Sequence, residues 1–531
     1  MKRLRRRAPG TSPTVAPAPS ISRRAALQTA LGAGVALVAA RAGRAVPVAG
    51  QSAIPDGFVP ALDQFIRSAL QTYGVPGAAV AVVSEGQTIF LRGYGVRRLG
   101  ERAPVDESTV FQLASNTKPF TAAALGTLVD AKRLDWDTPI ISYLPGFALA
   151  DPYPTTWATP RDMLAMRSGL PAFTGDLLGD AGYSRDHVLH QVRLLTPGAS
   201  FRERAYYSNI SYFIAGQVGA RAAGLSLETG WEELVRSRLL EPLGMHRSGV
   251  SSTDVPADGN WASNHVEVNG MVEPYPWVQG DVLGAAQSVV STAADMARWM
   301  TMLLDAGQFE GRRLLNADTI TEMFTPSMVA EVSFSEMPPI YADSGFAYGL
   351  GWGTYYFNDF QVMEKGGALD GVRTVVELVP AKRLGIVVLA NLNLLPFPEA
   401  VRGFVLERFL GPAPTDIQAE IRARTAQLEQ LLAASPPPAN PLPPSLPLAG
   451  YAGDYASALY GRVAVRADGD GLRLTFGPAG YAGAMAHYSR DTFLLTFARP
   501  DEGSQQATFT IGPTGQPTAF DTETLGRFRR T

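Results

Sequence analysis

Ser115 and Lys118 have the residue types and the spacing that nucleophilic catalysis requires. They stand three positions apart in Ser115-Asn116-Thr117-Lys118, at the start of a helix-like run, and one helical turn would place both side chains on the same face. The chain of 531 residues contains only five lysines, and the other 41 of its 46 basic residues are arginine. Arginine keeps its proton at ordinary pH, whereas a buried lysine can become a neutral base. We therefore expect Lys118 to activate Ser115 as a nucleophile.

Two later motifs carry side chains that complement this pair. The triplet Tyr207-Ser208-Asn209 supplies a phenol that can relay a proton and an amide that both donates and accepts hydrogen bonds. The segment Lys365-Gly366-Gly367-Ala368 stands just before a β-branched run at residues 372–379. We expect Lys365 to lower the pKa of Lys118, and to attract a substrate carboxylate or to lower the pKa of Tyr207.

The order S-x-x-K, Y-x-N, K-x-G resembles the serine β-lactamase and penicillin-binding-protein-like hydrolases. That superfamily includes class C β-lactamases, D-alanyl-D-alanine carboxypeptidases, D-aminopeptidases and family VIII esterases. Shorter segments agree with the resemblance, which covers about residues 55 to 410, among them Pro242-Leu243-Gly244-Met245 and Tyr348-Gly349-Leu350-Gly351-Trp352. The resemblance implies an α/β (α+β) fold in which helices flank an antiparallel sheet and a helical domain is inserted.

The resemblance also assigns roles to individual residues. It implies an acyl-enzyme on Ser115, with the other catalytic side chains at Lys118, Tyr207, Asn209 and Lys365. The oxyanion hole would consist of the backbone N–H groups of Ser115 and Ala368, and Gly366 and Gly367 would contact the substrate.

The substrate class remains open between three readings. β-Lactamases usually carry Thr or Ser where this chain has Gly366, so we favour an ester or amide substrate, as for a carboxylesterase or a D-amino-acid peptidase. A β-lactamase is the first alternative. The second is a sensor that binds penicillin or cell-wall peptides and keeps the acylated serine without turning it over.

The pattern of apolar runs predicts the elements that position these motifs. A helix around residues 62–70 precedes a hairpin at residues 79–83 and 88–91, and a second helix spans residues 119–134. Several helical patterns fill residues 160–300, before a second hairpin at residues 372–379 and 385–390 and a closing helix at 404–410. Strands at both ends with helices between them predict one sheet with a helical insertion.

Composition divides the chain into four parts. We expect residues 1–50 to form an export signal and an unstructured N-terminus, and residues 54–411 to form the hydrolase domain. Residues 412–448 combine a helical pattern from Ile417 to Leu432 with seven prolines in 436–447, which predicts a semi-rigid linker. From residue 449 to 531 short alternating strands predict a small β domain, which resembles the lipocalin-like domains attached to some of these hydrolases.

The N-terminus predicts the location. Arg23-Arg24 precedes a weakly apolar run from Ala25 to Ala40 and resembles a bacterial twin-arginine (Tat) signal. Sixteen residues are short for a membrane span, which needs roughly 20. We expect cleavage around residues 45 to 53, a periplasmic or secreted product, and no stable membrane insertion afterwards.

Other chemistries lack their sequence signatures. The chain has no cysteine, no G-x-S-x-G, no H-E-x-x-H and no P-loop, and its five histidines have no evident serine partner. We therefore expect neither a Ser-His-Asp triad nor a metal or organic cofactor. The net charge of -3 predicts no nucleic-acid partner, which leaves a small-molecule or peptide substrate and an open oligomeric state.

Overall fold

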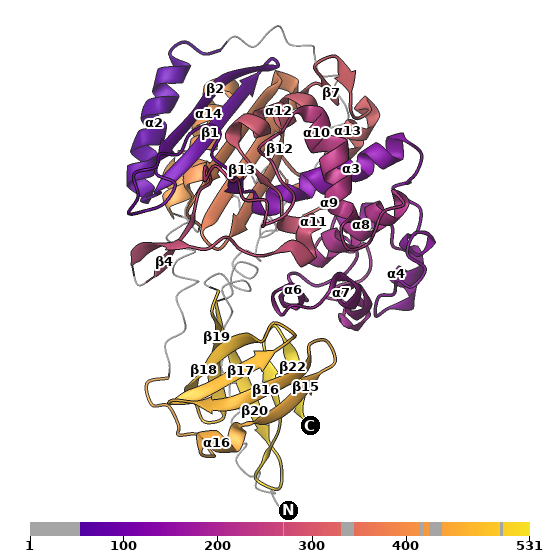
Figure 1. Cartoon of the computed structure of the whole chain (residues 1–531), viewed down its shortest axis with the longest axis vertical. Coiled ribbons are helices and arrows are strands. Elements are labelled where there is room, and N and C mark those ends of the chain that lie inside the picture. Colours follow the sequence, from indigo (N-terminus) through magenta and orange to yellow (C-terminus); the bar gives the residue numbers. More distant parts are fainter. Residues whose placement is uncertain are drawn as a thin grey trace, which may run out of the picture.

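The computed structural model describes residues 54–268, 270–330, 345–393, 396–413, 416, 418–423, 438–499 and 503–531. The predicted export signal and most of the predicted connecting helix lie outside these residues. The described chain forms a larger part built on a sheet and a smaller C-terminal barrel (Figure 1).

An eight-stranded sheet, antiparallel throughout, forms the centre of the larger part. Both predicted hairpins lie in it, and β1 pairs with β14 in the register Ala78↔Ala390. Strands from the two ends of the larger part therefore lie side by side in one open sheet. In spatial order the strands are β2 (Gln87–Gly95), β1 (Gly77–Ser84), β14 (Leu384–Ala390), β13 (Val372–Val379), β12 (Phe360–Leu369), β11 (Gly353–Phe357), β10 (Ala347–Tyr348) and β9 (Met328–Val329).

Helices cover the central strands. The terminal helices α2 (Phe58–Tyr73) and α14 (Phe397–Leu410) pack together, and α14 also contacts β13 and β14. Helix α12 (Ala293–Leu304) packs on β1 and β14. Every residue of β1, β13 and β14 is buried, including the polar side chains of Arg373, Thr374 and Glu377 in β13.

The helix that follows Ser115 is buried on all sides. Helix α3 (Thr117–Asp130) begins two residues earlier and ends four residues earlier than predicted, and its residues 117–128 are all buried. It lies against α8 (Asn209–Ala222) and α11 (Gly284–Gln287). Small residues in Ala122-Ala123-Ala124 permit this close packing. The closing helix is longer than predicted and begins at Phe397.

The region between the outer strands is mostly helical, as predicted, but it also contains strands. The hairpin of β4 (Asn264–Val268) and β5 (Met271–Tyr275) interrupts it, and two further two-stranded sheets pair β3 (Phe111–Gln112) with β6 (Val290–Ser291) and β7 (Gln308–Phe309) with β8 (Arg312–Arg313). The remaining helices are α4 (Pro152–Trp157), α5 (Pro160–Leu164), α6 (Leu177–Asp180), α7 (Arg185–Gln191), α9 (Gly230–Val235), α10 (Glu241–Leu243) and α13 (Ala317–Phe324).

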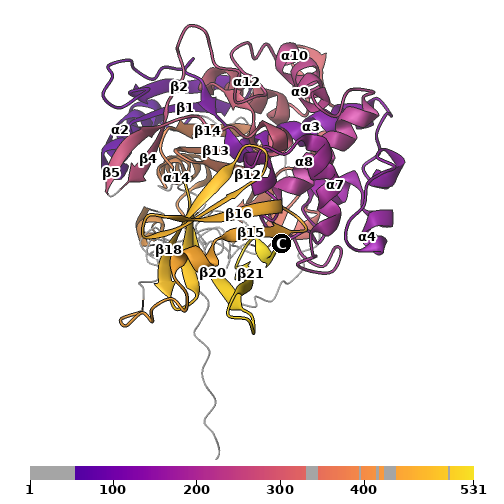
Figure 2. The ribbon, with the colours of Figure 1, turned by 60° about the horizontal axis from the view of Figure 1, so that its bottom comes forward.

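The C-terminal part is a closed barrel of eight strands, which confirms the predicted small β domain. A short helix, α16 (Leu448–Tyr451), leads into it, and Figure 2 shows the barrel in front of the larger part. Its strands are β15 (Gly453–Ser457), β16 (Gly461–Asp468), β17 (Gly471–Phe476), β18 (Tyr481–Ser489), β19 (Thr492–Phe497), β20 (Ser504–Ile511), β21 (Pro517–Thr522) and β22 (Gly526–Arg530).

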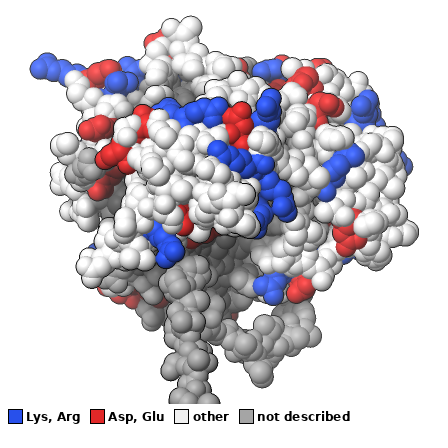
Figure 3. Space-filling model, turned by 90° about the horizontal axis from the view of Figure 1, so that it is seen from below, with Lys and Arg blue, Asp and Glu red and all other residues white. Residues whose placement is uncertain are grey.

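Charges of both signs lie side by side on the face seen from below (Figure 3). On the barrel, Arg466 pairs with Asp454 at 2.6 Å and Arg527 pairs with Asp521 at 3.6 Å. None of the helices in the described part of the chain combines the length and the apolarity needed to cross a bilayer.

Candidate active site

Ser115 sits in a tight turn immediately before α3. The turn, residues Ala114–Asn116, is a single 3₁₀ turn whose first residue has a φ of 52°, a left-handed conformation that non-glycine residues rarely adopt. Neighbouring strands hold the turn in place, because Leu113 donates its N–H to Val289 O at 2.9 Å and accepts a hydrogen bond from Thr374 Oγ1 at 2.9 Å. Ser115 therefore lies half-buried at the positive end of the helix dipole.

Lys118 is wholly buried and its Nζ lies 2.9 Å from Ser115 Oγ. Two other oxygens surround the same nitrogen: Asn209 Oδ1 at 2.8 Å and Ala286 O at 3.1 Å. A neutral amine has two N–H groups and one lone pair, so these two acceptors use both N–H groups. The lone pair is then directed at Ser115 Oγ, which is the arrangement a general base requires.

Electrostatics favour this neutral form of Lys118. Burial, and to a smaller extent the positive charge of Lys365, hold the pKa of Lys118 well below its usual 10.5. Asp176 opposes this shift and raises the pKa. The predicted effect of Lys365 on the pKa of Lys118 is confirmed.

Tyr207 completes the hydrogen bonds of the serine. Its hydroxyl donates to Ser115 Oγ at 2.5 Å, and its ring lies 4.6 Å from Lys118 Nζ and 5.2 Å from Lys365 Nζ. Burial raises the pKa of Tyr207 well above its usual 10. The suggestion that Lys365 lowers this pKa stays a prediction. The resting tyrosine is a neutral phenol that donates a hydrogen bond.

Asn209 is held by a carboxylate that sequence reasoning missed. The N-cap of α8 is Ser208, whose side chain accepts from Ser211 N–H, so Asn209 is free of a capping role. Its Nδ2 donates to Asp176 Oδ2 at 2.8 Å. Because an ionised carboxylate only accepts hydrogen bonds, Asp176 fixes the amide so that its oxygen faces Lys118.

The K-G-G segment lies inside a strand, which corrects its predicted place before the strand at residues 372–379. Lys365 and its neighbours belong to β12, one strand earlier. The side chain of Lys365 is 6% exposed, and burial lowers the pKa of Lys365 to about 8.

Gly367 is required by a close approach of β12 to the turn that holds Ser115. A Cβ at this position would stand 2.3 Å from Leu113 O and 3.1 Å from Ser115 N, so any side chain would force the two segments apart. Gly366 and Ala368 flank it on the same strand. Their roles in substrate binding and in the oxyanion hole stay predictions.

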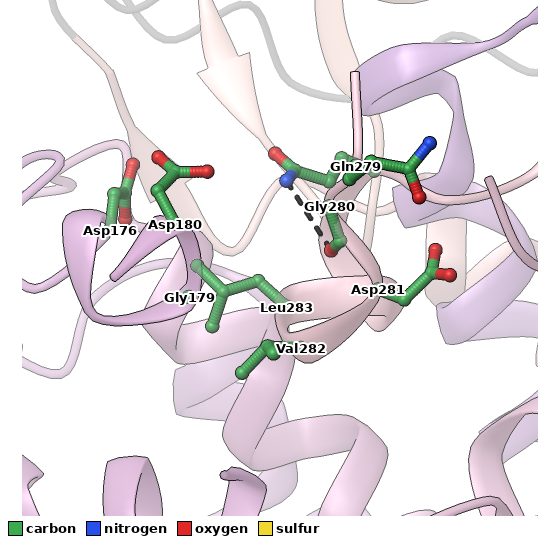
Figure 4. Close-up of a pocket in the computed structure, with 9 residues that line it drawn as sticks. Asp176, Gly179, Asp180, Gln279, Gly280, Asp281, Val282 and Leu283 are labelled. Atoms are coloured by element: carbon green, nitrogen blue, oxygen red, sulfur yellow. Dashed lines mark hydrogen bonds between the residues drawn. The ribbon is translucent and has the colours of Figure 1, made fainter. Parts of the chain in front are cut away.

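A pocket of about 200 Å³ lies next to Asp176 (Figure 4). Asp176 and Asp180 lie together on one wall, opposite Gly280, with the apolar side chains of Val282 and Leu283 below them. The pocket shares Asp176 with the hydrogen bonds around Lys118. Ser115, Lys118 and Tyr207 are not among the residues that line it.

Backbone groups hold the buried histidine of the larger part, His265. His265 is buried, accepts from Leu99 N–H at 3.0 Å and has its Nδ1 2.9 Å from Asn391 O, which is a structural role. Within the described ranges, no three His, Asp or Glu side chains are arranged to hold a metal ion.

Comparison with curated proteins finds relatives over most of the chain. Unguisins hydrolase ungD of Aspergillus violaceofuscus is 27% identical over 500 residues, which is 86% of each chain. Penicillin-binding protein 4 of Amycolatopsis lactamdurans is 30% identical over 335 residues, which cover 61% of this chain and 83% of that protein.

Solved structures share the fold. The octameric penicillin-binding protein homologue from Pyrococcus abyssi matches with a TM-score of 0.58 at 21% identity, over 88% of this chain and 99% of its own. A class C β-lactamase matches with a TM-score of 0.54 at 22% identity, over 67% of this chain and 96% of its own.

Two family profiles match, one to each part of the molecule. A domain of unknown function, DUF3471, matches residues 437–529, which include the barrel. The Beta-lactamase family matches residues 62–408, which include the sheet, its helices and all the residues around Ser115. With the fold and the site in agreement with that match, the chain belongs to the Beta-lactamase family.

Proposed function

We propose that this protein is a serine hydrolase that acts through an acyl-enzyme on an ester or an amide. The observation that carries the proposal is the surroundings of Lys118 Nζ, in which two acceptors use its N–H groups and the third neighbour is Ser115 Oγ. A neutral amine in this position can take the serine proton as the hydroxyl attacks.

The first half of the reaction acylates the serine. Ser115 Oγ bonds to the substrate carbonyl carbon, its proton passes to Lys118 Nζ, and the carbonyl π electrons move onto the oxygen. The backbone N–H groups of Ser115 and Ala368 would stabilise that oxyanion. When the carbonyl re-forms, the bond to the leaving group breaks, and the leaving group receives the proton from Lys118 through the hydroxyl of Tyr207.

The second half returns the free enzyme. A water molecule attacks the acyl carbon, and its proton passes to Lys118 directly or through the Tyr207 hydroxyl. Collapse of this second tetrahedral intermediate breaks the bond to Ser115 Oγ, which recovers its proton as the carboxylic acid leaves. The same base serves both halves, because it ends each half in its neutral form.

Esters or D-amino-acid peptides are the favoured substrates. Gly366 offers no hydroxyl to hold a β-lactam carboxylate, and a relative similar over 86% of both chains is named a hydrolase of unguisins. Reaction with β-lactams, by turnover or by retention of the acyl group, is the second candidate, since another relative is named a penicillin-binding protein.

One experiment separates these candidates. The purified protein and its Ser115→Ala variant are offered a short-chain nitrophenyl ester, a chromogenic cephalosporin and a D-alanyl peptide, and intact mass is recorded. Turnover of the ester or the peptide with loss in Ser115→Ala supports the proposal. Rapid turnover of the cephalosporin alone identifies a β-lactamase, and a stable adduct without turnover identifies a sensor.

We also propose that the protein is exported. The support is the twin-arginine segment at Arg23-Arg24, which lies outside the described residues. Replacing both arginines by lysine in the full-length chain should retain it in the cytoplasm of a bacterial host, and cell fractionation measures this. Unchanged release would refute the proposed signal.

A further inference from the structure

Aromatic rings fill the interior of the C-terminal barrel. Tyr455, Phe509, Phe520 and Phe528 are at most 4% exposed, and their neighbouring rings lie 4.6 to 6.0 Å apart. A core packed in this way stabilises the barrel but leaves little space for a ligand inside it. The contribution of the barrel to function must therefore come from its loops and outer surface.

Two loops at one end of the barrel contact a single short segment of the hydrolase part, residues 180–183. In the loop after β15, Tyr460 O accepts a hydrogen bond from the Tyr183 hydroxyl at 2.7 Å. In the loop after β17, Ala479 N–H donates to Ala181 O at 2.9 Å, and a Cβ on Gly477 would stand 2.4 Å from that same oxygen. The fit is too close for a larger residue at position 477.

The loop after β19 adds an arginine that bridges two carboxylates. Arg499 donates from Nη1 to both oxygens of Asp180 at 2.9 Å, and from Nε to Asp370 Oδ2 at 2.7 Å. The side chains of Arg499 and Asp180 are 14% and 13% exposed, and that of Asp370 is 1% exposed. Charge-assisted bonds at such buried positions are strong and geometrically specific.

The two carboxylates belong to opposite sides of the candidate active site. Asp180 ends α6, and the residue before that helix is Asp176, which orients Asn209 toward Lys118. Asp370 stands in the turn between β12 and β13, two residues after Ala368. Arg499 thus joins the helix that follows Asp176 to the turn that follows Ala368, a residue of the predicted oxyanion hole.

We propose that Arg499 is a positioning residue of the active site, supplied by the barrel, which fixes α6 and the β12–β13 turn relative to one another. The inference rests on the proposed function. Proton transfer and oxyanion stabilisation depend on separate groups, and both sets must be correctly positioned at the same time. A small displacement of either set lowers the rate. In this proposal the barrel acts on the rate by holding these two segments in place.

The test compares three variants of the full-length protein on a nitrophenyl ester. Arg499→Gln should lower kcat/KM by about 10- to 100-fold, mainly through kcat. Arg499→Lys should recover part of the loss, since an ammonium keeps the charge but lacks the planar fork that binds both carboxylates. Arg466→Gln is the matched control, because Arg466 is an exposed barrel arginine paired only on the barrel face, and it should match the wild type.

Hydrogen exchange supplies a readout that does not depend on turnover. Arg499→Gln should speed amide exchange in residues 176–183 and 369–372 and leave α3 unchanged. A kcat/KM within about twofold of the wild type, in a variant that melts cooperatively, would overturn the proposal. If Arg499→Gln does not fold, Asp180→Asn removes the negative charge from the α6 side of the bridge and leaves Asp370 in place. An unchanged kcat in that variant overturns the proposal equally.

The two proposals fail in different ways. If Ser115→Ala hydrolyses the ester as fast as the wild type, the proposed function is wrong. The role of Arg499 in catalysis then fails with it, even if hydrogen exchange shows that Arg499 holds both segments. If Ser115→Ala is inactive and Arg499→Gln keeps the kcat/KM of the wild type, the role of Arg499 is wrong and the proposed function stands.

Discussion

Asp176→Asn tests the arrangement around Lys118 most directly. Asp176 accepts the hydrogen bond from Asn209 Nδ2 at 2.8 Å and thereby turns Asn209 Oδ1 toward Lys118 Nζ, also at 2.8 Å. An asparagine at position 176 can offer either its oxygen or its nitrogen, so the amide of Asn209 is free to rotate by half a turn. In the rotated state an N–H group of Asn209 faces Lys118 and takes the lone pair that should face Ser115.

The size of the effect follows from that rotation. Asp176→Asn replaces a hydrogen bond to a charged group, worth about 1.5 to 3 kcal/mol, by a neutral one worth about 0.5 to 1.5 kcal/mol, so the preference for the productive orientation falls by about 1 to 2 kcal/mol. Since about 1.4 kcal/mol corresponds to a factor of ten in rate, kcat should fall by about 5- to 30-fold. The variant retains shape and volume, so the fall reports orientation rather than packing.

The pH dependence gives an independent readout with a fixed sign. Lys118 acts as a base only when it is neutral, so kcat/KM rises as pH passes upward through the pKa of Lys118. The charge of Asp176 raises that pKa. Its removal should move the acid limb of the profile to lower pH, while the plateau falls.

Initial rates on a short-chain nitrophenyl ester, read at the isosbestic wavelength of nitrophenol, measure both the plateau of kcat/KM and the pH of its acid limb. The matched control is Asp186→Asn, which removes the same charge from an exposed position in the first turn of α7. A plateau within about twofold of the wild type together with an unmoved acid limb would refute the role given to Asp176.

The remaining predictions concern the other parts of the site. Ser115→Ala should abolish both turnover and the covalent adduct, as initial rates and intact mass will show. Lys118→Arg should abolish nearly all turnover, because a permanent cation cannot act as a base. Near-normal hydrolysis by Lys118→Arg would contradict the mechanism. Lys365, whose pKa is lowered to about 8, is charged below that pH and neutral above it. KM for a carboxylate-bearing ester should therefore rise as pH passes 8 while KM for an uncharged ester does not, and equal profiles for the two esters would rule out this role. Gly367→Ala should inactivate the protein, since the added Cβ would stand 2.3 Å from Leu113 O; wild-type activity and melting temperature would show that β12 approaches less closely.

The chemistry on α3 could be predicted from the sequence because it is local. The spacing of Ser115 and Lys118 is set by one helical turn, and burial of the lysine follows from the small and apolar residues that continue the helix. The two hairpins were predictable for the same reason, since alternation and turn residues act over a few positions. The first hairpin spans β1 and β2, and the second spans β13 and β14.

The partners that tune the site could not be predicted, because tertiary structure alone brings them together. Asp176 is 33 positions from Asn209, and Ala286 is 168 positions from Lys118. Neither belongs to a motif with a spacing of its own. Arg499 is 319 positions from Asp180 and comes from a different part of the molecule, so only coordinates reveal the bridge.

The error over the K-G-G segment has a different origin. Glu364, Lys365 and two glycines are poor strand formers, so the sequence pattern placed this segment before the strand at residues 372–379 and not in a strand of its own. The pairing of β12 with β13 in the register Gly367↔Thr374 holds them extended nonetheless. Pairing across the β12–β13 hairpin, which residues 370–371 close, overrode the propensity of these residues at the point where the strand passes Ser115.

The interposed amide of Asn209 explains how a carboxylate can serve a neutral lysine. A direct contact between Asp176 and Lys118 would form a buried ion pair and hold the lysine protonated, which would remove the base. With the amide between them, the carboxylate sets the orientation through a hydrogen bond at 2.8 Å while its charge acts on Lys118 only from a distance. Burial and Lys365 then outweigh that charge and leave the pKa of Lys118 well below its usual value. The position of Asp176 is therefore a compromise between orientation and charge, and moving α6 by a small distance would disturb both.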